Sequence, residues 1–318
     1  MDPPAPRYLN VPQYIGSRLL STVPVLLLIS VFVFSIMHLL PGDPAMLILQ
    51  GQYATTPEQV ARLRRDLGLN DPVYVQYGRF LADALQGDLG RSVQFKRPVM
   101  AVILERLPRT AELTAAALVI AVAMGVTLGV VAGVRQNSWV DNLSIVLSVV
   151  GLTMPIFYIG LLLILLFSVK LMWFPVTTGS ALQRLVLPGF TLGFVSAGII
   201  ARLVRANLLE VLRQDFITTA RSKGLADRVI LYRHALRNML IPVITVIGLQ
   251  IGGLLSGSVI TETVFNRPGL GRLAVEAILW KDFPLAQGTI LFTATAYLIV
   301  NLVVDVSYAW LDPRIRYS

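Results

Sequence analysis

The sequence predicts an all-α membrane protein with six membrane-spanning helices and a small helical extracytoplasmic subdomain between the first two. Its mean hydropathy is +0.70 and only 14% of its 318 residues are charged, so a soluble domain of this length would have more apolar surface than one core can bury. Six stretches are mostly apolar over about 20 residues, the length that crosses a bilayer. Lysine and arginine gather in alternate connections between these stretches, as expected of a membrane protein.

The six predicted spans cover residues 17–40, 113–134, 143–169, 185–204, 239–260 and 287–311. The first is not a cleaved signal peptide, because its apolar run is too long and the sequence PGDPA follows it instead of a small-residue cleavage site. Thr153, Met154 and Pro155 interrupt the third span, where a proline frees backbone groups. Pro155 therefore marks either a bend beside a translocation path or a simple packing kink.

The orientation follows from short basic segments. Arg7 and Arg18 precede or begin the first span, Arg135 follows the second, and Arg314 and Arg316 end the chain. Short basic segments stay in the cytoplasm, so both termini of this multi-pass protein are expected there. Residues 1–40 then form the cytoplasmic N-terminus and first span, 41–109 an extracytoplasmic helical segment, and 110–318 a core with five spans. The segment 41–109 is also basic, but long segments translocate largely regardless of charge.

The extracytoplasmic segment carries signals for three helices. Thr56 and Gln59 frame a capping box with Pro57 at the first helical position. Gly68 is placed to end that helix, and Gly87 to end a second helix that starts after Asp71-Pro72. A third, amphipathic piece begins at Arg97-Pro98 and leads toward the second span. A folded subdomain explains these signals better than a mere connector.

A polar stretch, residues 207–238, separates the fourth and fifth spans, and we call it the basic insert. Residues 214–223 predict a short helix, Gly224 a left-handed helix stop, and residues 225–238 a second helix with apolar residues at helical spacing. Topology alone would explain the positive charges. It would not explain the two helical periods, which suit docking into a groove on a soluble partner.

The basic insert also resembles a known family. TTARSKGL (218–225) and RHALRNMLIPV (233–243) resemble the cytoplasmic coupling loop of ABC importer permeases, in the branch that handles peptides and nickel. Further matches occur in the same order along the chain: LLPGDPA (39–45), GDLGRS (87–92), ETVFNRPGLGRL (262–273), DFPLAQG (282–288) and VDVSYAWLDPRIR (304–316). Together they resemble the first, B-type, of the two dipeptide permeases in such systems.

The resemblance implies a type I ABC importer permease fold and a pore-forming subunit that is not itself an enzyme. No GxxxxGK[ST] motif occurs, so ATP and Mg²⁺ are expected in partner subunits and no cofactor in this chain. The implied partners are a paralogous second permease, two ATPase subunits or domains, an extracytoplasmic substrate-binding protein and membrane lipid. The positions that match the coupling loop are Thr218, Thr219, Ala220, Arg221, Lys223, Gly224, His234 and Leu236. Peptide is the expected substrate; a nickel chelate, glutathione or another small solute is the alternative.

Two further groups of residues are candidates within this frame. In the fifth span Gln250 and Ser256 either line a cavity that contacts substrate or serve helix packing, since small residues surround them. After that span, Glu262, Arg267, Pro268 and Gly269 form either an outer gate, a contact with the binding protein, or a solvated turn.

Other functions have weaker support in the sequence. A proton-coupled carrier keeps ionisable residues within its spans, and Asp305 is the clearest candidate, although an interfacial structural role fits it better. An intramembrane hydrolase would need a GxSxG or HExxH motif, and neither occurs. The chain has no cysteine and two distant histidines, which gives no metal-site spacing. The net charge of +9 does not indicate nucleic acid, because no aromatic residues alternate with the basic ones.

Overall fold

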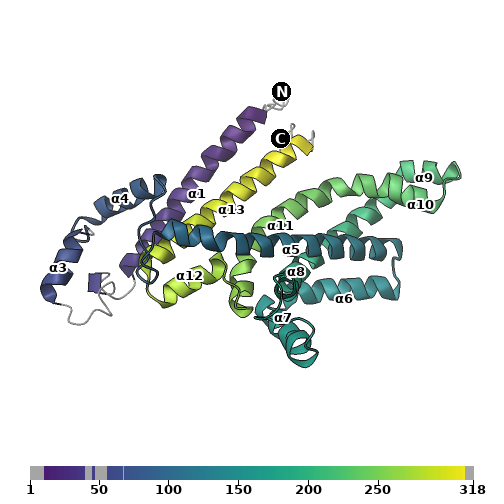
Figure 1. Cartoon of the computed structure of the whole chain (residues 1–318). Coiled ribbons are helices and arrows are strands. Elements are labelled where there is room, and N and C mark those ends of the chain that lie inside the picture. The colour runs from purple at the N-terminus through teal and green to yellow at the C-terminus, as the bar shows by residue number, and fades with distance from the viewer. Residues whose placement is uncertain (1–10, 40–44, 47–55, 67, 312–318) are drawn as a thin grey trace, which may run out of the picture. The chain divides into compact units, whose positions relative to one another are not determined.

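The computed structural model describes residues 11–39, 45–46, 56–66 and 68–311. Most of the LLPGDPA motif and the C-terminal Arg314 and Arg316 lie outside these ranges. The described chain is built from helices (Figure 1). They are α1 (Val11–Leu39), α3 (Pro57–Asp66), α4 (Val73–Leu85), α5 (Val99–Val134), α6 (Trp139–Thr153), α7 (Ile156–Leu163), the π-helix η1 (Ile164–Lys170), α8 (Gln183–Leu212), α9 (Asp215–Ser222), α10 (Asp227–Val229), the π-helix η2 (Ile230–Ala235), α11 (Leu236–Val264), α12 (Leu270–Leu279) and α13 (Phe283–Leu311).

Five helices of the described chain are long and apolar enough to cross a membrane: parts of α1, α11 and α13, and the whole of α5 and α8. The predicted third span differs, because α6 and the α7–η1 pair are bent by 110° relative to each other. The break falls at Met154-Pro155, where both residues have extended backbone with ψ of 134° and 135°. A residue before proline is driven out of the helical region, so the interruption seen in the sequence becomes a sharp bend. Five spans become six if the bent pair is counted as one.

The chain divides into two compact units. The first contains residues 1–15, 109–267 and 300–318, and the second contains residues 16–108 and 268–299. Helix α5 belongs to both, because it continues through Pro108 without a break. The third piece expected in the outer segment is therefore the beginning of α5. The side of the membrane on which residues 41–109 lie stays a prediction.

The first unit is organised around α8. Its membrane window is 61% buried, against 33% or less for every other candidate span of the described chain. Three glycines of α5, one helical turn apart, lie against α8: Gly125 faces Ile200, Gly129 faces Val204 and Gly133 faces Leu208. A Cβ atom at Gly129 would lie 2.6 Å from the carbonyl oxygen of Ala201. Glycine thus lets the two backbones approach more closely than any other residue would allow.

The second unit is held by a buried carboxylate. Asp282 is 1% exposed and lies between α12 and α13. One of its oxygens accepts hydrogen bonds from the Ser92 hydroxyl at 2.5 Å and from the Gln94 N–H at 3.0 Å, and the other accepts from the Leu285 N–H at 3.2 Å. Because the carboxylate caps α13 and also binds the turn before α5, the GDLGRS and DFPLAQG motifs meet here.

The helix signals of the outer segment are confirmed. Thr56 and Gln59 exchange two hydrogen bonds, from the Thr56 N–H to Gln59 Oε1 at 3.1 Å and from the Gln59 N–H to Thr56 Oγ1 at 3.4 Å. Gly68 and Gly87 have φ of +64° and +81° and end α3 and α4 in Schellman motifs. Within the same unit, the Tyr77 hydroxyl of α4 lies 2.8 Å from the Ser30 hydroxyl of α1.

The α5–α8 contact leads to a first prediction. Gly129→Ala is expected to destabilise the protein by about 1–3 kcal/mol, because the new methyl group meets backbone that cannot move aside. Gly78→Ala in α4 is the control, since a Cβ atom there has nothing within 4 Å. In the control, alanine should be neutral or stabilising by up to about 1 kcal/mol. Thermal unfolding in detergent and subunit abundance in membranes measure both, and equal effects would contradict the packing described.

The Asp282 site leads to a second prediction. Asp282→Asn keeps the shape but replaces one accepting oxygen with a donor, so a buried donor loses its partner. The expected loss is about 1–3 kcal/mol of stability. Asp83→Asn, on the exposed side of α4, is the matched control and should change thermal unfolding little. A stable Asp282→Asn variant would show that the carboxylate is not the anchor of this unit.

Candidate functional site

The basic insert has the predicted helix, corner and helix. Helix α9 ends at Ser222, and Gly224 follows with φ of +77°. The Gly224 N–H donates to the Arg221 carbonyl oxygen at 2.9 Å and the Leu225 N–H to that of Ala220 at 3.3 Å, which is a Schellman motif. The space around a Cβ atom at Gly224 is open. Glycine is therefore required here for its backbone angle and not for close packing.

The second helix of the insert differs from the expectation. It does not end at Asn238, because every residue from Asp227 to Val264 is helical, through α10, η2 and α11. Pro242 lies inside this run and removes one helix hydrogen bond. Its neighbours Met239 and Val243 are fully buried, and their packing retains the helix. Residues 207–212 of the insert are the last residues of α8, so the insert is continuous with both the fourth and the fifth spans, and its separate part begins at α9.

One side of the insert is packed into the first unit. Ile217 and Ala220 of α9 and Ile230 of η2 are buried in a cluster with Val204 and Leu208 of α8. Leu236 packs against the same cluster and His234 is half-buried. Of the eight positions expected to meet an ATPase, Ala220 and Leu236 therefore hold the insert to the spans. They do not project toward a partner.

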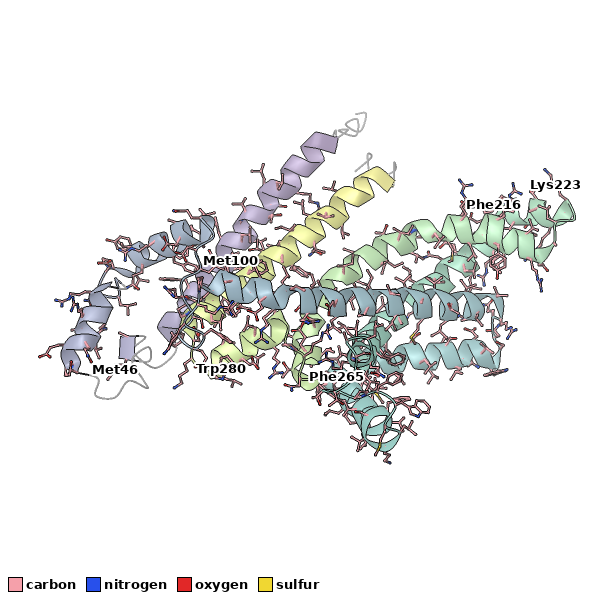
Figure 2. All side chains as sticks on the ribbon, in the orientation of Figure 1. Met46, Met100, Phe216, Lys223, Phe265 and Trp280 are labelled. Atoms are coloured by element: carbon pink, nitrogen blue, oxygen red, sulfur yellow. The ribbon has the colours of Figure 1, made fainter. Side chains whose placement is uncertain are left out.

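The other side of the insert is open. Thr218, Thr219, Arg221 and Lys223 are exposed, and Tyr232 is 69% exposed. Figure 2 shows Phe216 and Lys223 standing away from the ribbon of α9 and the following tip. Arg221 lies 3.8 Å from Asp227, but both side chains are solvated, so this ion pair contributes little. The open side offers cations and aromatic rings to a partner surface.

The residues expected beside a translocation path lie on two elements of the first unit. Ser256 is exposed on α11, in one stripe with Leu249, Gly253 and Ile260, and Gln250 next to it is half-buried. Pro155 is exposed at the bend between α6 and α7. Within the described part of the first unit, this stripe of α11 is uncovered.

The C-terminal end of α11 is clamped to α5, and we call these contacts the outer clamp after the predicted orientation. Glu262 is 0% exposed and accepts a hydrogen bond of 2.6 Å from the Thr110 hydroxyl. Arg267 donates to Glu112 at 2.7 Å and to the carbonyl oxygen of Arg109 at 3.1 Å. Burial lowers the pKa of the Arg267 guanidinium below its ordinary value, and the charge and hydrogen bond of Glu112 oppose that shift. The charged groups at this end thus satisfy one another.

The burial of these residues limits which of them can form an outer gate or contact a binding protein. A fully buried carboxylate cannot touch an external protein, so Glu262 acts in this conformation through α5. Arg267 is 10% exposed and equally inward. In the second unit Pro268 is exposed, whereas Gly269 is buried at the start of α12. Of the four residues, only Pro268 offers a surface for docking.

Sequence reasoning missed the ion pair between Asp141 and Arg205. Asp141 of α6 is 1% exposed and Arg205 of α8 donates to both of its oxygens, at 2.6 and 2.8 Å. The partners are 64 residues apart, so no local pattern pairs them. Both lie just outside the predicted spans 143–169 and 185–204, where a charged residue is ordinary and gives no signal. Asp305, the candidate proton-carrier residue, is half-buried and has interaction partners.

The chain was compared with known proteins. The family described as "Binding-protein-dependent transport system inner membrane component" matches residues 125–317, and the N-terminal part of such membrane components matches residues 11–114. The dipeptide transport system permease protein DppB of Alkalihalophilus pseudofirmus is 42% identical, over 96% of this chain and 99% of the relative. The glutathione transport system permease protein GsiC of Escherichia coli O6:H1 is 43% identical, with the same coverage.

A solved structure shares the fold. An inward-facing form of the MetNI methionine ABC transporter superposes with a TM-score of 0.56 at 16% identity, over 67% of this chain and 97% of the matched chain. At this identity the likeness concerns the fold alone.

The outer clamp leads to a third prediction. Arg267→Lys keeps the charge but cannot hold both Glu112 and the carbonyl oxygen of Arg109 with a rigid fork. We expect a loss of about 1–3 kcal/mol in thermal unfolding. Arg97→Lys is the control, because Arg97 and Glu105 form an exposed ion pair worth about 1 kcal/mol at most. If the two variants unfold alike, the clamp does not stabilise the contact between α5 and the C-terminal end of α11.

Proposed function

Since this chain belongs to the family of binding-protein-dependent transport system inner membrane components, we propose that it forms half of the path by which an ABC importer takes up peptides, dipeptides first among them. As a member of that family it is a multi-pass permease of the inner membrane, a transport component and not an enzyme. Importers of this kind work with an ATPase and a substrate-binding protein.

The observation that carries the proposal is the two-sided basic insert. Its inner side is buried against α8 through Ile217 and Ala220, and its outer side presents Arg221, Lys223 and Tyr232. A segment that served topology alone would need the charges but not the buried side. A segment that transmits force needs both, because force applied at an exposed tip must reach the spans through packed atoms.

The mechanism we propose follows the contacts. Closure of the ATPases on ATP displaces α9. Because α9 packs on Val204 and Leu208, α8 moves with it, and because α10, η2 and α11 are continuous, the fifth span moves as well. The stripe of α11 that carries Ser256, with Gln250 beside it, then changes its exposure to the path. Hydrolysis of ATP returns the spans to the starting arrangement.

The proposed complex contains a paralogous second permease, two ATPase subunits or domains and an extracytoplasmic binding protein, embedded in lipid. ATP and Mg²⁺ bind to the ATPases, and this chain carries no cofactor and binds no nucleic acid. Both of its termini lie in the cytoplasm, where the basic insert meets the ATPases. The uncovered stripe of α11, with Leu249 and Ile260, is the surface we assign to the second permease or to the shared path.

The substrate proposal rests on the names of the relatives. One is a dipeptide permease and another a glutathione permease, and both names describe small peptides. Uptake of labelled dipeptide by cells that express the whole transporter tests this directly. Competition by excess dipeptide supports the proposal, whereas competition only by glutathione, a nickel chelate or another small solute would replace the substrate and leave the permease role intact.

The proposed transmission of force through the basic insert leads to a fourth prediction. Gly224→Val places a β-branched residue at positive φ, which costs about 1–2 kcal/mol and distorts the corner. Transport is expected to fall roughly tenfold, the ratio to which about 1.4 kcal/mol corresponds, while the ATPase activity of the purified complex is no longer stimulated by substrate and binding protein.

Gly87→Val is the matched control. Gly87 has φ of +81°, also ends a helix in a Schellman motif, and has open space around its Cβ position. It lies outside the insert, so the variant should share the backbone strain and keep transport coupled to ATP hydrolysis. If both variants lose transport equally at equal abundance, the basic insert does not transmit force as proposed, and backbone strain alone explains the loss.

A further inference from the structure

A cavity of about 290 Å³ lies between α5, α6 and α8 of the first unit. We propose that it binds an anionic phospholipid, with the phosphate held by arginine and the upper part of an acyl chain along the apolar wall. This site is separate from the basic insert, the α11 stripe and the outer clamp, and the inference goes beyond the transport function.

The walls of the cavity suit a lipid chain. Leu128 of α5 and Ile145 and Val149 of α6 supply apolar side chains, and the small residues Gly129 and Ala132 of α5 complete the lining on that side. Ile145 and Val149 are 43% and 45% exposed, so the cavity opens on the surface of the chain. A cavity with apolar walls favours an apolar ligand group, such as an acyl chain, over water.

Arginines from α8 supply the charge. Arg205 uses Nε and Nη2 to bind Asp141, so that pair is neutral overall. Arg202, one helical turn earlier, also lines the cavity and is exposed, and in the described parts of the chain no carboxylate lies within ion-pair distance of it. The cavity therefore carries one net positive charge beside apolar walls. That combination matches an anionic headgroup with its chains, whereas a soluble phosphate would gain nothing from the walls.

The position along the helices fits the headgroup level. Trp139 begins α6 and is 75% exposed, and tryptophan of this kind gathers at the membrane–water interface. Asp141 lies in the first turn after it, and Ser144 and Ser148 of the cavity follow one and two turns later. The arginines thus lie near the level of lipid phosphates and the apolar wall extends below them. Basic pockets between spans on the cytoplasmic side bind anionic lipid headgroups elsewhere.

A lipid-quenching experiment on the assembled transporter tests the proposal. The chain has no cysteine, so Leu143→Cys, exposed beside the cavity and not part of its lining, carries one fluorophore; the complex without this substitution gives the background. Vesicles contain nitroxide-labelled phosphatidylglycerol or nitroxide-labelled phosphatidylcholine at the same mole fraction. We expect phosphatidylglycerol to quench with about fivefold higher apparent affinity, the preference that one arginine near an anionic surface provides.

Three variants separate this site from general membrane charge. Arg202→Gln should lose the preference, and Arg202→Lys should retain it. Arg213→Gln, at the exposed end of α8 and outside the cavity, should leave it unchanged. Equal quenching by the two lipids in the unsubstituted protein, or a preference that survives Arg202→Gln, would overturn the proposal.

Two further outcomes would identify a different occupant of the cavity. Displacement of phosphatidylglycerol by glycerol 3-phosphate, which has the headgroup phosphate without chains, would make this a site for soluble phosphate and overturn the lipid assignment. The absence of quenching by either lipid would show that a partner subunit covers the cavity, and would overturn it too. Peptide uptake by the Arg202→Gln complex is measured separately, so loss of the lipid preference is distinguished from loss of transport.

Discussion

The close approach of α5 and α8 is the contact on which the first unit depends. Gly125, Gly129 and Gly133 bring the two backbones together, and α8, which also packs on α6, α7 and α11, is the most buried candidate span of the described chain. A buried α8 can anchor the basic insert at one end and carry Arg202 and Arg205 in between. Without that contact, neither the packing of α9 nor the cavity beside α6 would have a fixed wall. Helix packing in lipid relies on such small residues because the bilayer gives apolar side chains no reason to associate.

Charged groups inside the chain follow a second constraint. Asp141, Glu262 and Asp282 are each nearly or fully inaccessible, and each accepts hydrogen bonds from a partner on another element. A lone buried carboxylate would be strongly unfavourable, so these contacts also fix how their elements pack. Arg202 is not under this constraint, because it is exposed where it lines the cavity.

The features that could be predicted from the sequence depend on local signals. The capping box at Thr56, the helix stops at Gly68, Gly87 and Gly224 and the interruption at Pro155 depend on a few neighbouring residues, and all appear in the structure. The family could be recognised because its motifs are local as well. The features that could not be predicted depend on distant partners. They include the 110° size of the bend and the inward burial of Ala220. They also include the pairs Asp141–Arg205 and Thr110–Glu262, which are 64 and 152 residues apart. The helix was expected to end at Asn238, before the predicted span 239–260; instead it continues through Pro242, whose neighbours Met239 and Val243 are buried.

The unbroken helix from Asp227 to Val264 spans about 57 Å at 1.5 Å per residue. A rod of that length, held near both ends, does not let its ends move independently. One end packs in a cluster with α8 through Ile230 and Met239, and the other end is hydrogen-bonded to α5 through Glu262. Contacts with two different helices therefore act on one continuous helix, so a rearrangement at either end is constrained by the packing at the other.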